Sequence, residues 1–256
     1  MAAEWQITCW YLAMLLLVAL LAKLTSYRLA GGRHWAELAT SSFFWSPWFC
    51  AKSWQRRPRL TAGTGRPVVA SCVADIALVT LVYATVIPLL AGLPWWLQSY
   101  LAAVPFWLLL KALSSLCQLV WLVFGQLVPS IDHQPWRSVS LADFWGRRWN
   151  RLIGDWLAQA VFSPLKRRPR LAMLATFAVS GALHELVVSL PLTAVYGESV
   201  WGWFIGYFCL QFGGCTLERK LRLPPLARRL MLWAVVLLPL PLVLNRGTLL
   251  IFHLGG

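Results

Sequence analysis

A histidine and a carboxylate stand side by side, as His184 and Glu185, inside a long apolar stretch of the sequence. Ionisable side chains are costly in a segment surrounded by lipid, so by default they indicate chemistry rather than packing. A neutral imidazole, with an unperturbed pKa of about 6.5, can take a proton from a hydroxyl near neutral pH. The other interpretation is a histidine that is hydrogen-bonded across a helix interface and has no part in a reaction.

A second polar block ends at Asn150, 34 positions before His184, and reads Asp-Phe-Trp-Gly-Arg-Arg-Trp-Asn over residues 143–150. Ser140, three residues before Asp143, predicts a helix N-cap. Asp143 and Arg147 are four residues apart and can pair on one helix face. We therefore expect residues 138–162 to form a helix that lies on the membrane interface or dips inward from it. An ordinary basic amphipathic surface helix explains the same spacing.

Composition places both blocks in a membrane protein. The 256 residues are 59% hydrophobic and 12% charged, which is more apolar than soluble domains are. The predicted fold is therefore a single all-α domain, residues 1–256, built as a multi-pass bundle with about six transmembrane helices. The six apolar stretches are 5–24, 67–90, 95–123, 171–190, 200–217 and 230–250.

Two segments depart from simple membrane spans. Pro105 predicts a kink or tilt in the third stretch. Residues 38–54 are rich in Phe and Trp, are broken by Pro47 and are too short to span, so an interfacial or re-entrant segment is expected there.

Basic residues are concentrated in three loops, 25–66, 124–170 and 218–229, which hold twenty of the 23 Lys and Arg residues. The loops at 91–94 and 191–199 hold none. The positive-inside rule then predicts that the basic loops are cytoplasmic and that both termini lie on the other side, in a bacterial inner membrane or an endoplasmic reticulum. Because the net charge of +14 serves topology in this way, nucleic-acid binding is not predicted.

Other charged and sulfur-containing residues have simpler explanations. Asp75 and Lys111 are expected to pair between neighbouring helices, with a substrate contact as the less favoured role. The six cysteines show no metal or redox spacing, so no metal site is predicted. Before the first apolar stretch there is Glu4 and no cation, which favours a retained span over a cleaved signal.

The two polar blocks together resemble the wax-synthase branch of the membrane-bound O-acyltransferase family. The resemblance rests on Ser140-Leu141-Ala142-Asp143, on the string from Phe144 to Asn150, and on Ser180-Gly181-Ala182-Leu183-His184-Glu185, and it covers about residues 137–190. It implies that Asn150 and His184 are the family's two characteristic polar positions. At 256 residues the chain is shorter than most members, and the shortfall is expected at the N-terminal end.

The resemblance also implies a reaction. A fatty-acyl group passes from a thioester, usually acyl-CoA, to the hydroxyl of a lipophilic alcohol, and no cofactor beyond the acyl donor is implied. His184 would act as the general base, and Asn150 would donate to the oxyanion or hold the thioester. Arg147 and Arg148 would bind CoA phosphates. The remaining residues expected at the substrate are Asp143, Phe144, Trp145, Trp149 and Ser180.

The depth of the two catalytic candidates poses a problem. At 1.5 Å per residue from Leu171, His184 lies roughly 20 Å into the membrane. Asn150, among arginines, is expected nearer the cytoplasmic interface. The two can share a substrate if the helix 140–160 dips inward, if the bilayer thins, or if the helix 171–190 starts later.

Two other functions are compatible with these residues. One is non-catalytic lipid binding or proton-coupled lipid transport, with His184 and Glu185 as a proton relay. A membrane prenyltransferase is less favoured, because the four aspartates are scattered and cannot hold Mg²⁺ on a diphosphate. For the acyltransferase, a long-chain alcohol is the first expected acceptor, followed by a sterol, isoprenoid or polyketide-like hydroxyl. Membrane lipids are the remaining expected partners, and the oligomeric state is left open.

Overall fold

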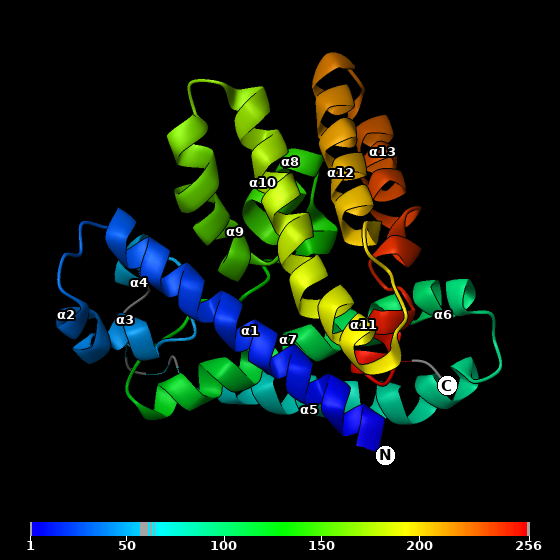
Figure 1. The fold of residues 1–256 in the computed structure, drawn as a ribbon, viewed down its shortest axis with the longest axis horizontal. Coiled ribbons are helices and arrows are strands. Elements are labelled where there is room, and N and C mark those ends of the chain that lie inside the picture. Colours follow the sequence, from blue (N-terminus) through cyan, green and yellow to red (C-terminus); the bar gives the residue numbers. More distant parts are fainter. Residues whose placement is uncertain (1, 57–60, 62, 64, 255–256) are drawn as a thin grey trace.

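A computed structural model describes residues 2–56, 61, 63 and 65–254. Within these residues all regular structure is helical, and five helical segments are long and apolar enough to cross a membrane (Figure 1). The predicted all-α, multi-pass membrane fold is confirmed. The five segments are Trp5–Leu29 in α1 (Ala2–Leu29), α5 (Gly65–Leu90), α7 (Ala103–Val123), Pro169–Tyr196, which contains α10 (Pro169–His184) and α11 (Leu190–Tyr196), and Pro225–Leu242, which contains α13 (Pro225–Leu237).

The remaining α-helices complete the fold. They are α2 (Trp35–Thr40), α3 (Ser42–Trp45), α4 (Ala51–Gln55), α6 (Trp95–Leu101), α8 (Leu141–Asp143), α9 (Arg151–Leu157), α12 (Trp203–Lys220) and α14 (Arg246–Ile251). Three π-helical turns, Phe144–Arg148, Ala158–Phe162 and Glu185–Ser189, lie next to α8, α9 and α10.

Three predicted spans differ from the structure. The third divides into α6 and α7, and Pro105, which lacks an N–H, lies in the first turn of α7. In the last, α13 ends at Leu237 before Pro239, a 3₁₀ turn at Leu240–Leu242 follows, and an α-helix resumes only at α14. The segment predicted at 200–217 is the 18-residue α12, which is not among the five candidate spans. Its last three residues, Glu218, Arg219 and Lys220, are charged.

The helices α5 and α7 form a long hairpin along one side of the molecule (Figure 1). Asp75 of α5 is buried, and its Oδ1 lies 2.6 Å from Lys111 Nζ on α7. Ser115 and Ser71 donate to the other carboxylate oxygen at 2.6 Å and 3.3 Å. The predicted intramembrane ion pair is confirmed.

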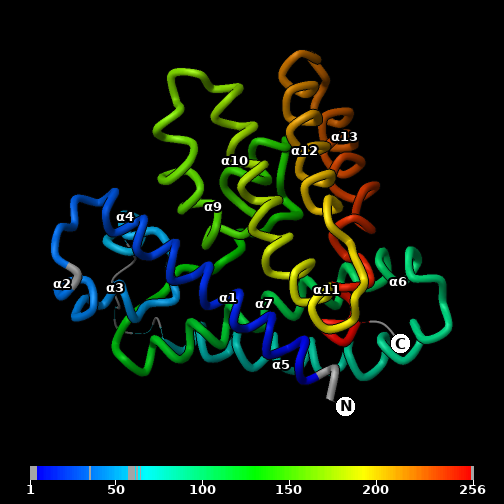
Figure 2. The backbone as a smooth tube through the Cα atoms, in the orientation of Figure 1, coloured from blue at the N-terminus to red at the C-terminus, as the bar shows by residue number. Residues whose placement is uncertain are grey.

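The helix α1 runs diagonally across the view in Figures 1 and 2 and packs against α11. Its Lys23 side chain holds the aromatic segment 43–49. Lys23 of α1 is buried and donates to the carbonyl oxygens of Phe43, Ser46 and Trp48 at 2.8, 2.6 and 2.9 Å. Each ammonium proton therefore meets an acceptor, as burial of a charge requires. At its other end α1 begins next to α14 (Figure 2).

A second hairpin carries the polar blocks. The arm made of α9 and Ala158–Phe162 turns at residues 163–168 and returns as α10, and α12 packs along α10 (Figure 1). Gly181 makes this close packing possible, because a Cβ there would lie 3.0 Å from Ile205 Cα.

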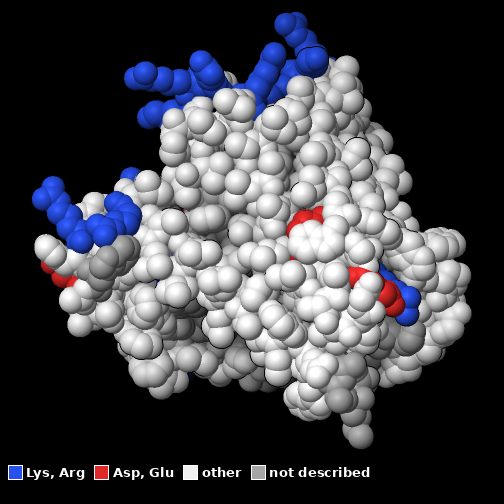
Figure 3. Space-filling model, viewed as in Figure 1, with Lys and Arg blue, Asp and Glu red and all other residues white. Residues whose placement is uncertain are grey.

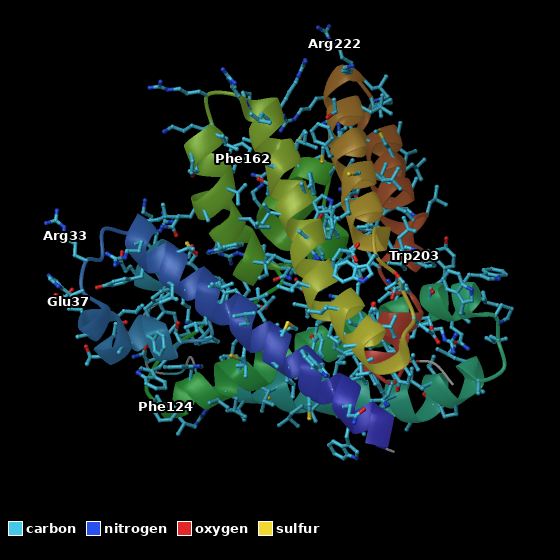
Figure 4. All side chains as sticks on the ribbon, viewed as in Figure 1. Arg33, Glu37, Phe124, Phe162, Trp203 and Arg222 are labelled. Atoms are coloured by element: carbon cyan, nitrogen blue, oxygen red, sulfur yellow. The ribbon has the colours of Figure 1, made fainter. Side chains whose placement is uncertain are left out.

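Lys and Arg side chains gather at the ends of these helices. Figure 3 shows them along the turn before α10, at the α12–α13 connection and beside α2. Arg222 points outward from the tip of α12, and Arg33 points outward at α2, whereas Trp203 lies at the other end of α12 (Figure 4). Arg57 and Arg59 of the predicted cytoplasmic loops lie outside the described residues.

Candidate active site

His184 is the last residue of α10, and its ring orientation is fixed from two sides. Nδ1 lies 2.8 Å from the Ser180 carbonyl oxygen, one turn earlier. The ring centroid lies 5.5 Å from Phe204 and 5.1 Å from Phe208, both on α12. A carbonyl oxygen can only accept, so Nδ1 donates the ring proton and Nε2 carries the lone pair. This is the tautomer of a base that acts through Nε2.

Glu185 fixes the start of α12 instead of pairing with a cation. It is 2% exposed, and Oε1 accepts backbone N–H groups of Gly202, Phe204 and Ile205 at 2.9, 3.0 and 3.3 Å. Ser189 Oγ donates to Oε2. The Glu185 carboxylate thus caps the N-terminus of the 18-residue α12. No described hydrogen bond joins Glu185 to His184, so the structure gives no support to a proton relay between them.

The motif segment before Asn150 begins with the predicted helix cap, but the helix that follows is interrupted. Ser140 caps α8, with its Oγ accepting Asp143 N–H at 3.0 Å, and Asp143 pairs with Arg147 at 3.1 Å. The predicted continuous helix over 138–162 is wrong, because Trp149 is extended and Asn150 is left-handed, with φ 38°. Asparagine tolerates this conformation better than most residues do, which is why the chain can restart here as α9.

Asn150 is the N-cap of α9. Its Oδ1 accepts Ile153 N–H at 3.4 Å, and its own N–H donates to Asp132 Oδ1 at 2.8 Å. In the part of the chain that the structure describes, Nδ2 donates to no protein group, so the carboxamide keeps a donor for a ligand. No described hydrogen bond or ring contact joins Asn150 directly to His184.

Aromatic residues connect the two polar blocks. The Trp145 ring contacts Phe208, at 5.8 Å between centroids, and Phe208 also contacts His184. Trp145 Nε1 donates to Gln211 Oε1 at 3.2 Å, which fixes the indole on α12. Phe144 stacks on Trp149 at 5.5 Å. Both polar blocks therefore pack against α12.

The two motif arginines are not equivalent. Both pair with Asp143, but Arg147 is 76% exposed and Arg148 only 23%. Arg148 also donates to the carbonyl oxygens of His133 and Gln134, at 3.4 and 3.5 Å. Burial alone would raise the pKa of Asp143, but the hydrogen bond from Arg148, the Val139 N–H and the charges of Arg148 and Arg147 outweigh it, so this pKa is lowered. The Arg148 guanidinium is thus largely occupied by hydrogen bonds within the protein, whereas the exposed Arg147 guanidinium is accessible to an anion.

The hairpin formed by α9 and α10 places Asn150 far along the chain from the basic turn (Figure 1). α10 begins at Pro169, two residues before the predicted start, so a later start is excluded as an explanation. Asn150 lies at the end of the α9 arm that is remote from the basic turn (Figure 1). Residues beside Asn150 (Leu152, Ile153) and beside His184 (Val179, Leu183) pack against one buried cluster. The geometry supports the inward dip of the motif segment.

Two buried residues of α12 that were not predicted complete the assembly. Gln211 is fully buried and donates to the Val235 carbonyl at 2.8 Å. Glu218 accepts the Leu141 N–H at 3.1 Å with each carboxylate oxygen and so caps α8. The two residues are seven positions apart in α12, which places them on one face of the helix. This spacing is the feature of the sequence from which their position on a common helix face could have been inferred.

Comparison with known proteins identifies the segment that carries this assembly. Residues 128–208 match the model of the membrane bound O-acyl transferase family. Over 123 residues the chain is 32% identical to probable long-chain-alcohol O-fatty-acyltransferase 7 of Arabidopsis thaliana, a match that covers 43% of this chain and 34% of that protein. Over 83 residues it is 36% identical to the long-chain-alcohol O-fatty-acyltransferase of Simmondsia chinensis, covering 28% and 24%.

A third relative differs in its named acceptor. The chain is 33% identical over 100 residues to acyl-CoA–sterol O-acyltransferase 1 of Arabidopsis thaliana, covering 36% of this chain and 27% of that protein. The chain spans about a third or less of the length of these curated relatives. The predicted resemblance to the wax-synthase branch of the family is confirmed.

Proposed function

We propose that this chain, which carries the membrane bound O-acyl transferase segment over residues 128–208, transfers a fatty-acyl group from an acyl thioester to the hydroxyl of a lipophilic alcohol. The observation that carries this proposal is the His184 ring, whose Nδ1 proton is committed to the Ser180 carbonyl oxygen. Nε2 is left as a base in a half-buried, aromatic setting. The proposal takes the alcohol acceptor from the names of the matched relatives.

The reaction follows from that geometry. His184 Nε2 removes the hydroxyl proton while the alcohol oxygen attacks the thioester carbonyl carbon. The Asn150 Nδ2 donor stabilises the charge that develops on the carbonyl oxygen. The C–S bond then breaks, the ester forms, and the thiolate recovers the proton from the imidazolium. No covalent intermediate with the protein is required.

The acyl donor fits the charge distribution. Acyl-CoA carries phosphates, and the exposed Arg147 is the motif cation best placed to meet them. We place the basic helix ends in the cytosol, where CoA is found, by the positive-inside rule. We assign the aromatic side chains of Phe144, Trp145 and Trp149 to the walls that contact the substrate chains. Ser180 holds the His184 ring, and Asp143 holds Arg147 and Arg148.

The test uses the purified chain in lipid nanodiscs with labelled palmitoyl-CoA and a panel of alcohols, from hexadecanol to a sterol. His184→Ala should lower ester formation by about 10²–10⁴-fold, the range of general-base catalysis. The matched control is His34→Ala, because His34 is exposed in the α1–α2 connection. Turnover by His184→Ala within twofold of the unmodified chain would overturn the mechanism. Proton flux into liposomes without acyl-CoA consumption would favour transport instead.

A further inference from the structure

The loop that joins α7 to the motif runs alongside the segment that contains Asn150. His133 N–H donates to the Arg148 carbonyl oxygen, and Arg151 N–H donates to the Ile131 carbonyl oxygen, each at 2.8 Å. Between these two bonds, Asn150 N–H donates to the Asp132 carboxylate, also at 2.8 Å. Three consecutive loop positions, Ile131 to His133, therefore hold the Asn150 N–H and the backbone on both sides of it.

The loop is in turn fastened to α7. Ile131 N–H donates to Ser114 Oγ at 3.1 Å, and Gln118 Nε2 donates to the Val128 carbonyl oxygen at 2.8 Å. Ser114 is buried, so this attachment is shielded from water. The long α5–α7 hairpin thus acts as the base from which the loop reaches Asn150.

Asn150 needs such an attachment because of its backbone. A left-handed conformation is strained for a residue with a side chain, although asparagine tolerates it better than most, and surrounding contacts maintain it. The Asn150 N–H points away from the helical ladder of the preceding π-turn and requires an acceptor outside it. Burial raises the pKa of Asp132, and the bond from Asn150 opposes this shift, so carboxylate and N–H form a partly desolvated pair.

We propose that Asp132 is a positioning residue, which holds the left-handed backbone of Asn150 so that the carboxamide faces the reacting thioester. This inference rests on the acyl transfer proposed above. Asp132 touches no substrate in this scheme and acts only through Asn150. Loss of its oxygen lets residues 149–151 relax toward the neighbouring helical turns, which swings the carboxamide away while leaving the chain folded.

The kinetic test compares two substitutions in the full chain in nanodiscs. Asp132→Ala removes the acceptor and should lower kcat by about 10–100-fold, as a displacement near 1 Å does, with both KM values within twofold. Asp132→Asn retains an oxygen that accepts the same N–H and should stay within about threefold in kcat. Ser130→Ala is the matched control, since Ser130 is exposed in the same loop. An unchanged kcat in Asp132→Ala, or equal losses in both Asp132 variants, overturns the proposal.

A second measurement does not depend on turnover. Hydrogen–deuterium exchange should speed up by about tenfold or more at Asn150 in Asp132→Ala, as expected when a partly buried N–H loses its acceptor. Exchange along α10 should stay unchanged. Equal exchange at Asn150 in both proteins overturns the positioning role. If the unmodified chain forms no ester but the exchange result holds, the proposed function fails and the role of Asp132 in holding Asn150 stands.

Discussion

Buried carboxylates are used differently in the α5–α7 hairpin and around α12. In the hairpin, Asp75 meets a cation, Lys111, and two hydroxyl groups on the facing helix surfaces. Around α12, Glu185 and Glu218 meet backbone N–H groups at the starts of α12 and α8. The partly buried Asp132, in the loop between α7 and α8, meets the N–H of Asn150 in the same way. The first arrangement neutralises a charge, and the second determines where a backbone segment begins.

The difference has an energetic consequence. An ion pair within a helix hairpin can be replaced as a pair by uncharged residues at little cost, because both charges disappear together. A carboxylate that accepts several N–H groups has no partner side chain that can be removed with it, and its loss leaves those donors unsatisfied. Residues of the second kind should therefore control activity, whereas those of the first kind should control stability alone.

The largest effect is expected from Glu185→Ala. Three backbone N–H groups at the start of α12 lose their acceptor, which should lower the free energy of unfolding by about 3 kcal/mol or more. Because Phe204 and Phe208 of α12 hold the His184 ring, kcat should fall on the order of 10²-fold. SDS-induced unfolding and single-turnover kinetics measure the two effects. Glu185→Gln, which keeps one accepting oxygen, should lose far less, and equal losses would contradict the capping role.

A smaller effect is expected from Gly181→Ala. The added Cβ would lie 3.0 Å from Ile205 Cα, so α12 must shift away from α10 by a few tenths of an ångström. We expect a loss of about 1 kcal/mol in unfolding free energy and a few-fold lower kcat, as in modest overpacking. Gly206→Ala is the control, because nothing lies within 4 Å of its added Cβ. Gly206→Ala should be stabilising, because alanine favours a helix more than glycine does. If Gly181→Ala raised the unfolding free energy by the same amount, the contact between α10 and α12 would have room for the added methyl group.

The smallest effect on activity is expected in the hairpin. Lys111→Met alone leaves Asp75 without its cation and should cost about 3 kcal/mol of unfolding free energy, at the low end for a buried pair because Lys111 is partly exposed. Combining it with Asp75→Asn should recover most of that loss. kcat should remain within twofold throughout. A double variant that is stable yet inactive would show that the ion pair contributes to the reaction, and the contrast between the two regions would fail.

Local patterns in the sequence predicted much of this arrangement. The apolar stretches predicted the spans, Ser140 predicted the cap of α8, and the isolated charges Asp75 and Lys111 predicted their ion pair. Each of these depends on neighbours in sequence or on a single pairing between adjacent helices.

The features that were not predicted depend on contacts between distant segments. The break at Asn150 has no proline or glycine beside it, and it is stabilised by Asp132, eighteen positions earlier. Glu185 caps a helix that starts after an intervening loop, which no local pattern signals. The split between α6 and α7 was partly signalled by Pro105, but its exact residue depends on packing. The roles of His184 and Asn150 in catalysis remain predictions.

The turn between α9 and α10 sets a limit on how this protein can vary in length. Each residue added within either arm would rotate the following side chains by about 100° and advance them by about 1.5 Å, which would carry Asn150 or His184 out of alignment. Residues added at 163–168 would only enlarge an exposed bend. We therefore expect inserted residues, such as an epitope tag or a fluorophore attachment site, to leave the protein folded and active at this bend. The same insertions within α9 or α10 should abolish activity.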